Sequence, residues 1–158
     1  MDRIDKLLAS EEYRSELEKT VCAEKDRIYC LHGLEHLTDV ARIAYIISLE
    51  ERLNIKKDII YAAALLHDIG RGRQYKDGTP HQKAAIELAK KLLPECGYNN
   101  NEILKISDAI DTHRHGEKKN LLGSVLQKAD NMSRLCFNCK ARDSCKWAAD
   151  EMNMTIKI

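Results

Sequence analysis

This 158-residue sequence has few aromatic residues and no excess of charge of either sign. Aromatic side chains make up 5% of it, and the formal net charge at pH 7 is +1. Proteins that bind single-stranded nucleic acid stack bases on aromatic rings, and nucleic-acid-binding faces carry a basic excess. The composition therefore argues against nucleic acid as a partner. It also provides no acidic excess of the kind that marks a solvating tail.

The sequence also lacks long apolar runs. None approaches the roughly 18 apolar residues that cross a bilayer, and residues 1–19 lack the apolar core of a secretory signal peptide. We therefore expect a cytoplasmic protein that does not bind membranes. In that compartment the six cysteines are expected to be thiols or metal ligands rather than disulfides.

Proline and glycine are scarce, and they lie between segments of helical periodicity. The length suggests one domain over residues 1–158, and 44% hydrophobic residues are enough for a core of ordinary size. We predict an all-α bundle of about six to seven helices. It comprises an N-terminal helix in residues 1–30, a core in 31–134 and a small Cys-rich extension in 135–158. Only residues 154–158 leave room for a strand.

Start and stop signals place the first half of the helices. Ser10 is a good N-cap for a helix over residues 11–26, and Asn54 marks the end of an amphipathic helix that starts near Leu34. Residues 59–66 are apolar on nearly every side, which is typical of a central helix.

The second half begins with residues 71–80, RGRQYKDGTP, which we expect to form a turn-rich loop. Thr79 is the expected N-cap of the next helix, which Gly97 ends. Two further helices are expected over residues 101–114 and 121–134.

Several histidines and aspartates interrupt or follow the apolar helical faces. A buried carboxylate is costly unless it is paired or bound to a metal. Imidazole and carboxylate together suit Fe, Mn, Co, Ni or Zn better than Ca or Mg, and helical bundles build such sites from several helices. A single buried histidine is more often a hydrogen-bonded core residue, but the whole array predicts a metal centre. Its members are His36, His67, Asp68, His81, His113 and Asp130.

The contexts of four of these residues resemble the HD superfamily of metal-dependent phosphohydrolases. The family pattern H…HD…D corresponds to His36 in "HLTDVARIA", His67-Asp68 in "AAALLHDIGR" and Asp130 in "KAD". The resemblance covers about residues 31–134. It implies a helical bundle that hydrolyses phosphoester or phosphoanhydride bonds of a nucleotide or other small phosphorylated substrate, using a metal-activated hydroxide.

The two further histidines are similar to those of a two-metal subgroup, the bacterial HD enzymes that hydrolyse diadenosine tetraphosphate. This resemblance implies that Asp68 bridges two ions and that His81 and His113 hold the second. A single-metal nucleoside 5'-monophosphate phosphatase would not need those two histidines and remains an alternative. No GYP motif follows the fifth predicted helix, so a cyclic-di-GMP phosphodiesterase is not expected.

Candidate substrate contacts surround the HD pair. Arg71 occupies a position where related enzymes have a phosphate-binding lysine, and Arg73 and Lys83 are weaker candidates for the same role. His115 is a candidate for protonating the leaving group or orienting substrate. His32 is expected to be structural.

Small residues and one aspartate near the candidate ligands allow two interpretations each. Gly70 and Gly72 would let the backbone approach a phosphate, or they simply end a helix. Asp111 is either a partner of a metal-binding histidine or a solvent-facing residue.

Three cysteines of the tail, in "RLCFNCKARDSCKW", have the spacing of a metal half-site. A structural site needs four ligands, and Cys30 is the best fourth, because it precedes His36 by the same six residues by which Cys136 follows Asp130. We expect Zn or an iron–sulfur cluster here, with reduced thiols packed around Trp147 as the alternative. The candidate ligands are Cys30, Cys136, Cys139 and Cys145.

A different class of function is also open. A nucleotide-binding or interaction module could retain the HD pocket without turnover. The sequence does not choose the base, the phosphate chain length, the native metal or between a monomer and a homodimer.

Overall fold

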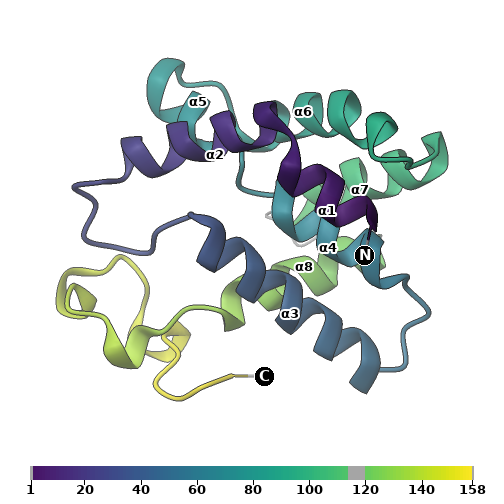
Figure 1. The fold of residues 1–158 in the computed structure, drawn as a ribbon. Helices are drawn as coiled ribbons and strands as arrows, with labels where there is room; N and C mark the ends of the chain where they lie inside the picture. The colour runs from purple at the N-terminus through teal and green to yellow at the C-terminus, as the bar shows by residue number, and fades with distance from the viewer. Residues whose placement is uncertain (1, 114–119, 158) are drawn as a thin grey trace.

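The structure is a computed structural model that describes residues 2–113 and 120–157. In this part of the chain it contains eight α-helices, three one-turn 3-10 helices and no strand, so the all-α prediction is confirmed. The helices are α1 (Asp2–Ala9), α2 (Glu11–Ala23), α3 (Leu34–Glu50), α4 (Lys57–Leu66), α5 (Arg71–Asp77), α6 (His81–Glu95), α7 (Asn100–Thr112) and α8 (Leu121–Met132), followed by η1 (Cys136–Asn138), η2 (Arg142–Ser144) and η3 (Ala149–Glu151) (Figure 1).

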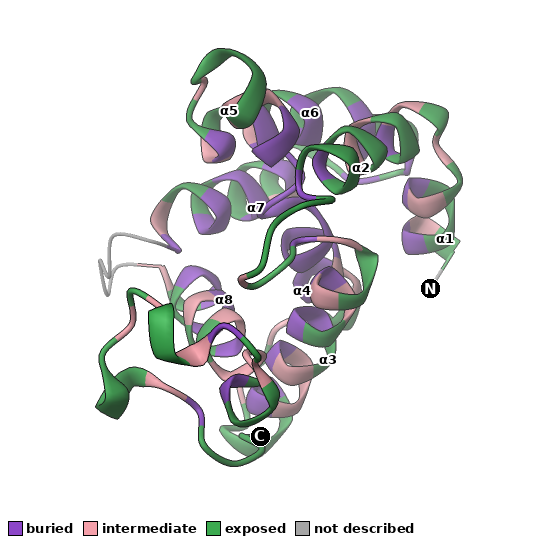
Figure 2. Ribbon diagram, turned by 90° about the vertical axis from the view of Figure 1, so that its left-hand side faces the viewer, coloured by how far each residue is buried: buried purple, intermediate pink, exposed green. Residues whose placement is uncertain are grey.

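Helix α4 lies in the middle of the bundle, between α2, α5 and α6 on one side and α3 and α8 on the other (Figures 1 and 2). It packs against α3, α7, α1, α8 and α6. Its residues from Ile59 to Leu66 are buried except Tyr61, as the continuous apolar pattern predicted. The HD pair therefore follows directly from the most enclosed helix.

The N-terminal region contains two helices because Ser10 interrupts it. The Ser10 hydroxyl accepts a hydrogen bond from Tyr13 N at 3.4 Å, which confirms its role as an N-cap. Helix α2 ends at Ala23, three residues before the predicted end at Asp26. The next residue, Glu24, turns its carboxylate into the interior.

The predicted loop at residues 71–80 is wrong, because Arg71–Asp77 forms α5. The helix packs on α2, where Gly72 N donates to the buried Thr20 hydroxyl at 3.0 Å. Tertiary packing thus overrides a turn-rich composition. The predicted N-cap Thr79 is also wrong: Pro80 is the N-cap of α6, and Thr79 N instead donates to Asp77 Oδ1 at 2.9 Å.

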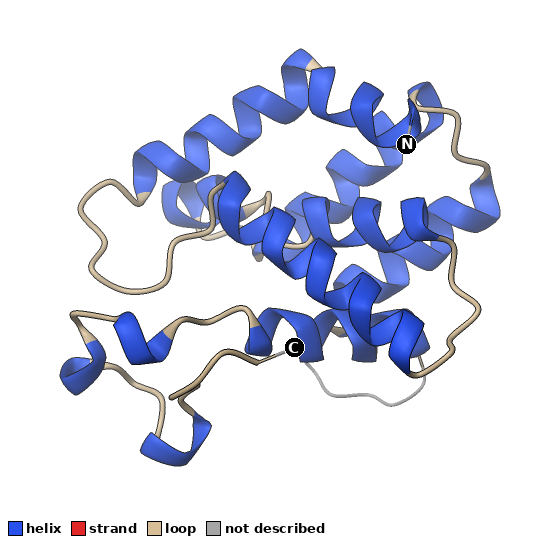
Figure 3. Ribbon diagram, turned by 60° about the horizontal axis from the view of Figure 1, so that its bottom comes forward, coloured by secondary structure: helices blue, strands red, loops and turns tan. Residues whose placement is uncertain are grey.

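The Cys-rich extension lies beside the linker between α2 and α3 (Figures 1 and 3). Tyr29 of that linker donates from Oη to Ser144 O of the extension at 3.1 Å. No strand forms in residues 154–157. Among the described helices, none is both long enough and apolar enough to cross a membrane.

Candidate metal centre

Asp68 is the centre of a buried cluster of histidines. It lies in the turn between α4 and α5 and is almost fully buried. Oδ1 is 3.3 Å from His81 Nε2, and Oδ2 is 3.5 Å from His67 Nε2 and 3.9 Å from His36 Nε2. The structure therefore brings together residues that lie far apart in the sequence.

Two of the histidines are held in the same way. His67 and His113 are the C-cap residues of α4 and α7, and each ring turns back onto its own helix. Nδ1 of His67 is 2.6 Å from Ala64 O, and Nδ1 of His113 is 2.6 Å from Ile110 O. A carbonyl oxygen can only accept, so each Nδ1 carries the proton and each Nε2 presents a lone pair to the cluster.

His36, from the first turn of α3, faces Asp130 near the end of α8. Its Nε2 lies 3.4 Å from Asp130 Oδ1, which is also 4.0 Å from His67 Nε2. Ser133 uses its hydroxyl proton to donate to Asp130 O at 2.8 Å. His36 Nδ1 lies 3.4 Å from Ser133 Oγ and therefore acts as the donor to that hydroxyl oxygen. The lone pair of His36 Nε2 is then also directed at the cluster.

The side chains form two potential ligand groups that share Asp68. One contains His36, His67 and Asp68, and the other Asp68, His81 and His113. In each group the ligand atoms lie within 4.8 Å of one another. Both groups contain Asp68, the carboxylate that the two-metal resemblance predicts to lie between two ions, whereas Asp130, also a predicted ligand, belongs to neither group.

The surroundings of the cluster favour neutral imidazoles and an ionised Asp68 carboxylate, which are the forms that can bind a metal ion. Burial and the neighbouring His67 lower the pKa of both His36 and His113 to about 4, so both imidazoles are neutral at neutral pH. Burial alone would raise the pKa of Asp68, but His67, Arg71 and other nearby imidazoles hold it well below its usual range. Neutral imidazole and ionised carboxylate are the forms that bind metals.

Arg71 lies at the start of α5 and is buried against the same carboxylate. Its Nε is 2.9 Å from Asp68 Oδ2, and this ion pair, opposed by burial, raises the pKa of the guanidinium. Of the predicted phosphate-binding residues, Arg71 is the one that reaches the cluster. A guanidinium at this position can meet an anionic group bound at the centre.

The other candidate substrate residues lie away from the centre or outside the described residues. Arg73 points to the surface, where its Nη1 pairs with Glu87 Oε2 at 2.8 Å. Lys83 is exposed on α6. His115 lies outside the described residues, and its assignment stays a prediction.

Gly70 and Gly72 serve helix packing. A Cβ on Gly70 would lie 2.2 Å from His81 O and 2.8 Å from Ala84 Cβ. A Cβ on Gly72 would lie 2.9 Å from Thr20 N. Both glycines therefore let the turn that carries Asp68 sit tightly against α6 and α2, and their approach to a phosphate stays a prediction.

His32 is the member of the cluster that the sequence did not identify. It is buried, and its Nε2 lies 3.7 Å from Asp68 Oδ2. Glu24 holds it by accepting hydrogen bonds from His32 N at 2.7 Å and from Nδ1 at 2.6 Å, and a third from Tyr75 Oη at 2.6 Å. No periodic signal in the sequence pointed to it, because His32 lies in the linker before α3 and its partner Glu24 follows the end of α2.

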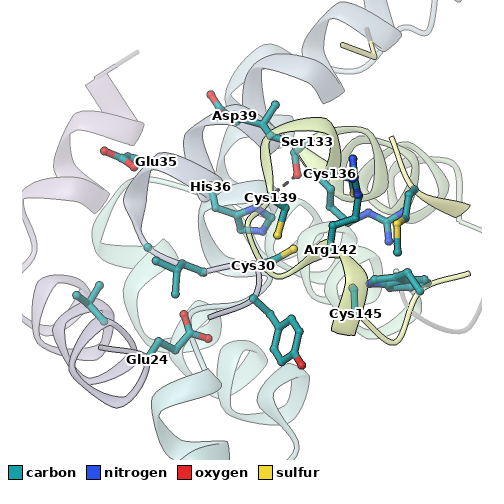
Figure 4. A pocket seen from close by; sticks show the side chains of 18 of the residues that line it. Glu24, Cys30, Glu35, His36, Asp39, Ser133, Cys136, Cys139, Arg142 and Cys145 are labelled. Atoms are coloured by element: carbon teal, nitrogen blue, oxygen red, sulfur yellow. Dashed lines mark hydrogen bonds between the residues drawn. The ribbon is translucent and has the colours of Figure 1, made fainter. Parts of the chain in front are cut away.

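A cavity of about 620 Å³ opens beside the cluster (Figure 4). Its lining comes from the end of α2, the α2–α3 linker, the start of α3, the segment after α8 and the Cys-rich extension, and it includes His36 of the cluster and Glu24. Tyr29 and Trp147 contribute aromatic surface, and Arg134 stacks over the Trp147 ring at 4.2 Å. Pockets of this size hold small organic ligands.

Comparison with known proteins decides the family. The HD domain model matches residues 33–135 of this chain. The chain belongs to the HD-domain family. Together with the solved neighbour below, this membership supports a metal-dependent phosphohydrolase in general terms, with no indication of its substrate.

Relatives of this HD domain include an uncharacterized protein of Clostridium beijerinckii, 43% identical over 156 residues and 99% of each chain. Ribonuclease Y of Treponema denticola is 29% identical over 145 residues, or 81% of this chain and 28% of that protein. The crystal structure of a predicted HD superfamily hydrolase from an uncultured Thermotogales bacterium has a TM-score of 0.59 and 30% identity. It covers 84% of this chain and 74% of that one. The chain therefore spans only about a quarter of the length of this ribonuclease Y relative.

Proposed function

We propose that this HD domain is a two-metal hydrolase that cleaves a phosphoester or phosphoanhydride bond of a nucleotide. The observation that supports this most directly is the convergence of acceptors around Asp68. The Nε2 atoms of His36, His67 and His113 have no hydrogen-bond partner among the described residues. Lone pairs that face one another and a carboxylate repel, and a cation among them removes that repulsion.

The donor set fits divalent transition metals. Imidazole nitrogens with two carboxylates suit Fe, Mn, Co, Ni or Zn, and the shared Asp68 supplies one oxygen to each group. Bound ions of this kind lower the pKa of a water molecule and neutralise phosphoryl oxygens. The carbonyls of Ala64 and Ile110 fix the orientation of two of the rings in advance.

The remaining residues of the centre have roles toward the substrate. Arg71, whose Nε lies 2.9 Å from Asp68 Oδ2, would donate from its Nη groups to a phosphoryl oxygen. His32, with Nδ1 committed to Glu24, presents Nε2 to the same space and can accept a hydrogen bond there. Both side chains are buried, so they act where water is largely excluded.

The adjoining cavity supports a nucleotide as the substrate. A volume of about 620 Å³ exceeds what inorganic phosphate needs, and Tyr29 and Trp147 provide faces on which a base can stack. Arg142 on the same wall can pair with a further phosphate group. A dinucleoside polyphosphate such as diadenosine tetraphosphate has both of these parts and is the finer form of the proposal.

Phosphate release after reconstitution with Mn²⁺ tests the proposal. The panel contains diadenosine tetraphosphate, the nucleoside 5'-monophosphates and inorganic pyrophosphate. We expect turnover of the nucleotide substrates and its loss in both His81→Ala and His113→Ala. Full activity of these two variants on monophosphates would support the single-metal phosphatase instead, and binding without turnover in every metal would support the non-catalytic module.

A second candidate is cleavage of an RNA phosphodiester bond, which the similarity to ribonuclease Y favours. The net charge of +1 argues against it, because RNA binding gains most of its affinity from basic residues. A short oligoribonucleotide in the same panel separates the two candidates. Cleavage of the oligomer faster than of any mononucleotide would favour the ribonuclease.

A further inference from the structure

Four of the six cysteines gather on the wall of the cavity. Cys30 comes from the α2–α3 linker, and the other three from the extension, and all four are free thiols that line the same space (Figure 4). The two remaining cysteines lie elsewhere, Cys22 exposed in α2 and Cys96 buried at the end of α6. Four of the cysteines therefore form one group, and the other two do not belong to it. Its members are Cys30, Cys136, Cys139 and Cys145.

The backbone of the extension presents its cysteines from two tight turns. Cys139 directly follows η1, and its N donates to Cys136 O at 3.2 Å. Cys145 directly follows η2, and its N donates to Arg142 O at 3.0 Å. A C-x-x-C pair closed by one turn is the usual half-site of structural zinc.

The extension is held mainly by polar contacts, such as those from the buried Asn153 side chain to Asn131 O and Arg134 O, and it buries little apolar surface. Of residues 135–157, the buried ones are Cys136, Ala141 and Asn153, while Leu135 and Phe137 are exposed. Its regular structure consists of three one-turn helices. A segment that buries so little apolar surface usually needs a covalent or metal cross-link to stay ordered.

We propose that Cys30, Cys136, Cys139 and Cys145 bind a structural zinc ion that fixes the extension to the α2–α3 linker. Unlike the ligand atoms around Asp68, no three of the four sulfurs lie within 4.8 Å of one another, so zinc binding requires the turns of the extension and the Cys30 segment to move closer together. The site is separate from the HD centre and does not depend on catalysis. Its consequence is positional: zinc holds the outer wall of the cavity against the segment that carries His32 and His36.

Zinc content of the full chain, purified without chelators, tests the proposal. Asp68→Ala, which removes the shared ligand of the HD centre, should retain about one zinc ion per chain. Adding Cys136→Ser and Cys139→Ser to that variant should remove it, whereas adding Cys22→Ser and Cys96→Ser, the matched control, should not. Zinc that is absent, or that persists after the first pair of substitutions, would overturn the site.

Limited trypsin digestion of the wild-type chain provides a readout that needs no substitution. Lys140 and Lys146 are exposed in the extension, and zinc should protect the bonds that follow them. A chelator should expose both bonds, and added zinc should restore protection. Cleavage at the same rate with and without zinc would contradict the proposal. So would iron together with acid-labile sulfide in the purified protein, or disulfide bonds among the four cysteines.

Discussion

At the scale of single residues, the environment of each imidazole decides what it can do. His67 and His113 each have Nδ1 tied to a carbonyl three residues earlier, whereas His32 has Nδ1 tied to the Glu24 carboxylate. His32 is therefore distinguished from the other histidines, although it faces the same Asp68.

Glu24→Gln should lower kcat/KM by about 10- to 100-fold, the usual effect of losing a group that orients a metal-centre residue. The glutamine keeps the shape but not the charge that holds His32. Tyr75→Phe is the matched control, because it removes a hydrogen bond to the same carboxylate without touching His32. Equal losses in the two variants would show that Glu24 acts through general stability.

The sequence identified most of these side chains but not their orientations. His36, His67, Asp68, His81, His113 and Asp130 were chosen from context, and the structure brings all six together. Arg73 was chosen because it follows the HD pair in the sequence. In the structure it pairs with Glu87 of α6, a contact that no local motif indicates. His32 was passed over because its partner Glu24 lies in a different segment.

At the scale of elements, the turn between α4 and α5 is fixed by close contacts on both sides. Tyr13 of α2 donates from Oη to Leu65 O at 3.1 Å, and Thr20 Oγ1 donates to Ile69 O at 3.3 Å. On the opposite side Gly70 lies against the first turn of α6. These contacts set the position of Asp68 relative to His81.

Gly70→Ala should destabilise the protein by about 1–3 kcal/mol, because the new methyl group overlaps His81 O. It should also weaken metal binding, since relief of the overlap moves His81 away from Asp68. Thermal unfolding with and without Mn²⁺ measures both effects. Gly78→Ala is the control: it has open space but a φ of 79°, so it should cost stability without changing metal affinity.

A second contact between elements joins α1, α4 and α7. Arg3 Nε donates to Asp58 Oδ2 at 2.8 Å, and Nη1 donates to Glu102 Oε2 at 2.6 Å. The Arg3 hydrogen bond, with a further one from Asn99 N, lowers the pKa of Glu102 from 4.5 to about 2. A depressed carboxyl pKa contributes stability above the unfolded pKa that is lost as the pH falls through the folded one.

Glu102→Gln should therefore flatten the acid dependence of stability between pH 4.5 and about 2. At neutral pH the variant should melt below the wild type, and near pH 2 the two should converge. Thermal melts across this window test the expectation. The control Glu95→Gln, at an exposed position of α6, should follow the wild-type curve. A Glu102→Gln curve that stays parallel to the wild-type curve would show that Glu102 does not cause the acid dependence.

The helix boundaries that the sequence predicted correctly are those fixed by local chemistry. The N-cap at Ser10 and the stop at Gly97 were predicted and confirmed, because both depend on local chemistry. Helix α5 was missed, because its stability comes from packing of Gly72 on α2, which composition does not reveal.

At the scale of the whole molecule, the fold brings two clusters of candidate ligands close together. Imidazoles and carboxylates gather around Asp68 in the bundle, and four free thiols line the adjoining cavity, which His36 also lines. The order of helices along the chain follows from apolar periodicity, so the sequence predicted the bundle. The cavity between the bundle and the extension depends on long-range contacts such as Tyr29 to Ser144, and it could not be predicted.

The number of Mn²⁺ ions bound per chain tests the central claim most directly. Thiolates are poor ligands for Mn²⁺, so the cysteine cluster does not contribute to the count. We predict about two ions for the wild type, about one for His81→Ala, and none for Asp68→Ala, with Asp108→Asn, an exposed aspartate on α7, as the unchanged control. Undiminished Mn²⁺ binding in Asp68→Ala would contradict a centre built around that carboxylate.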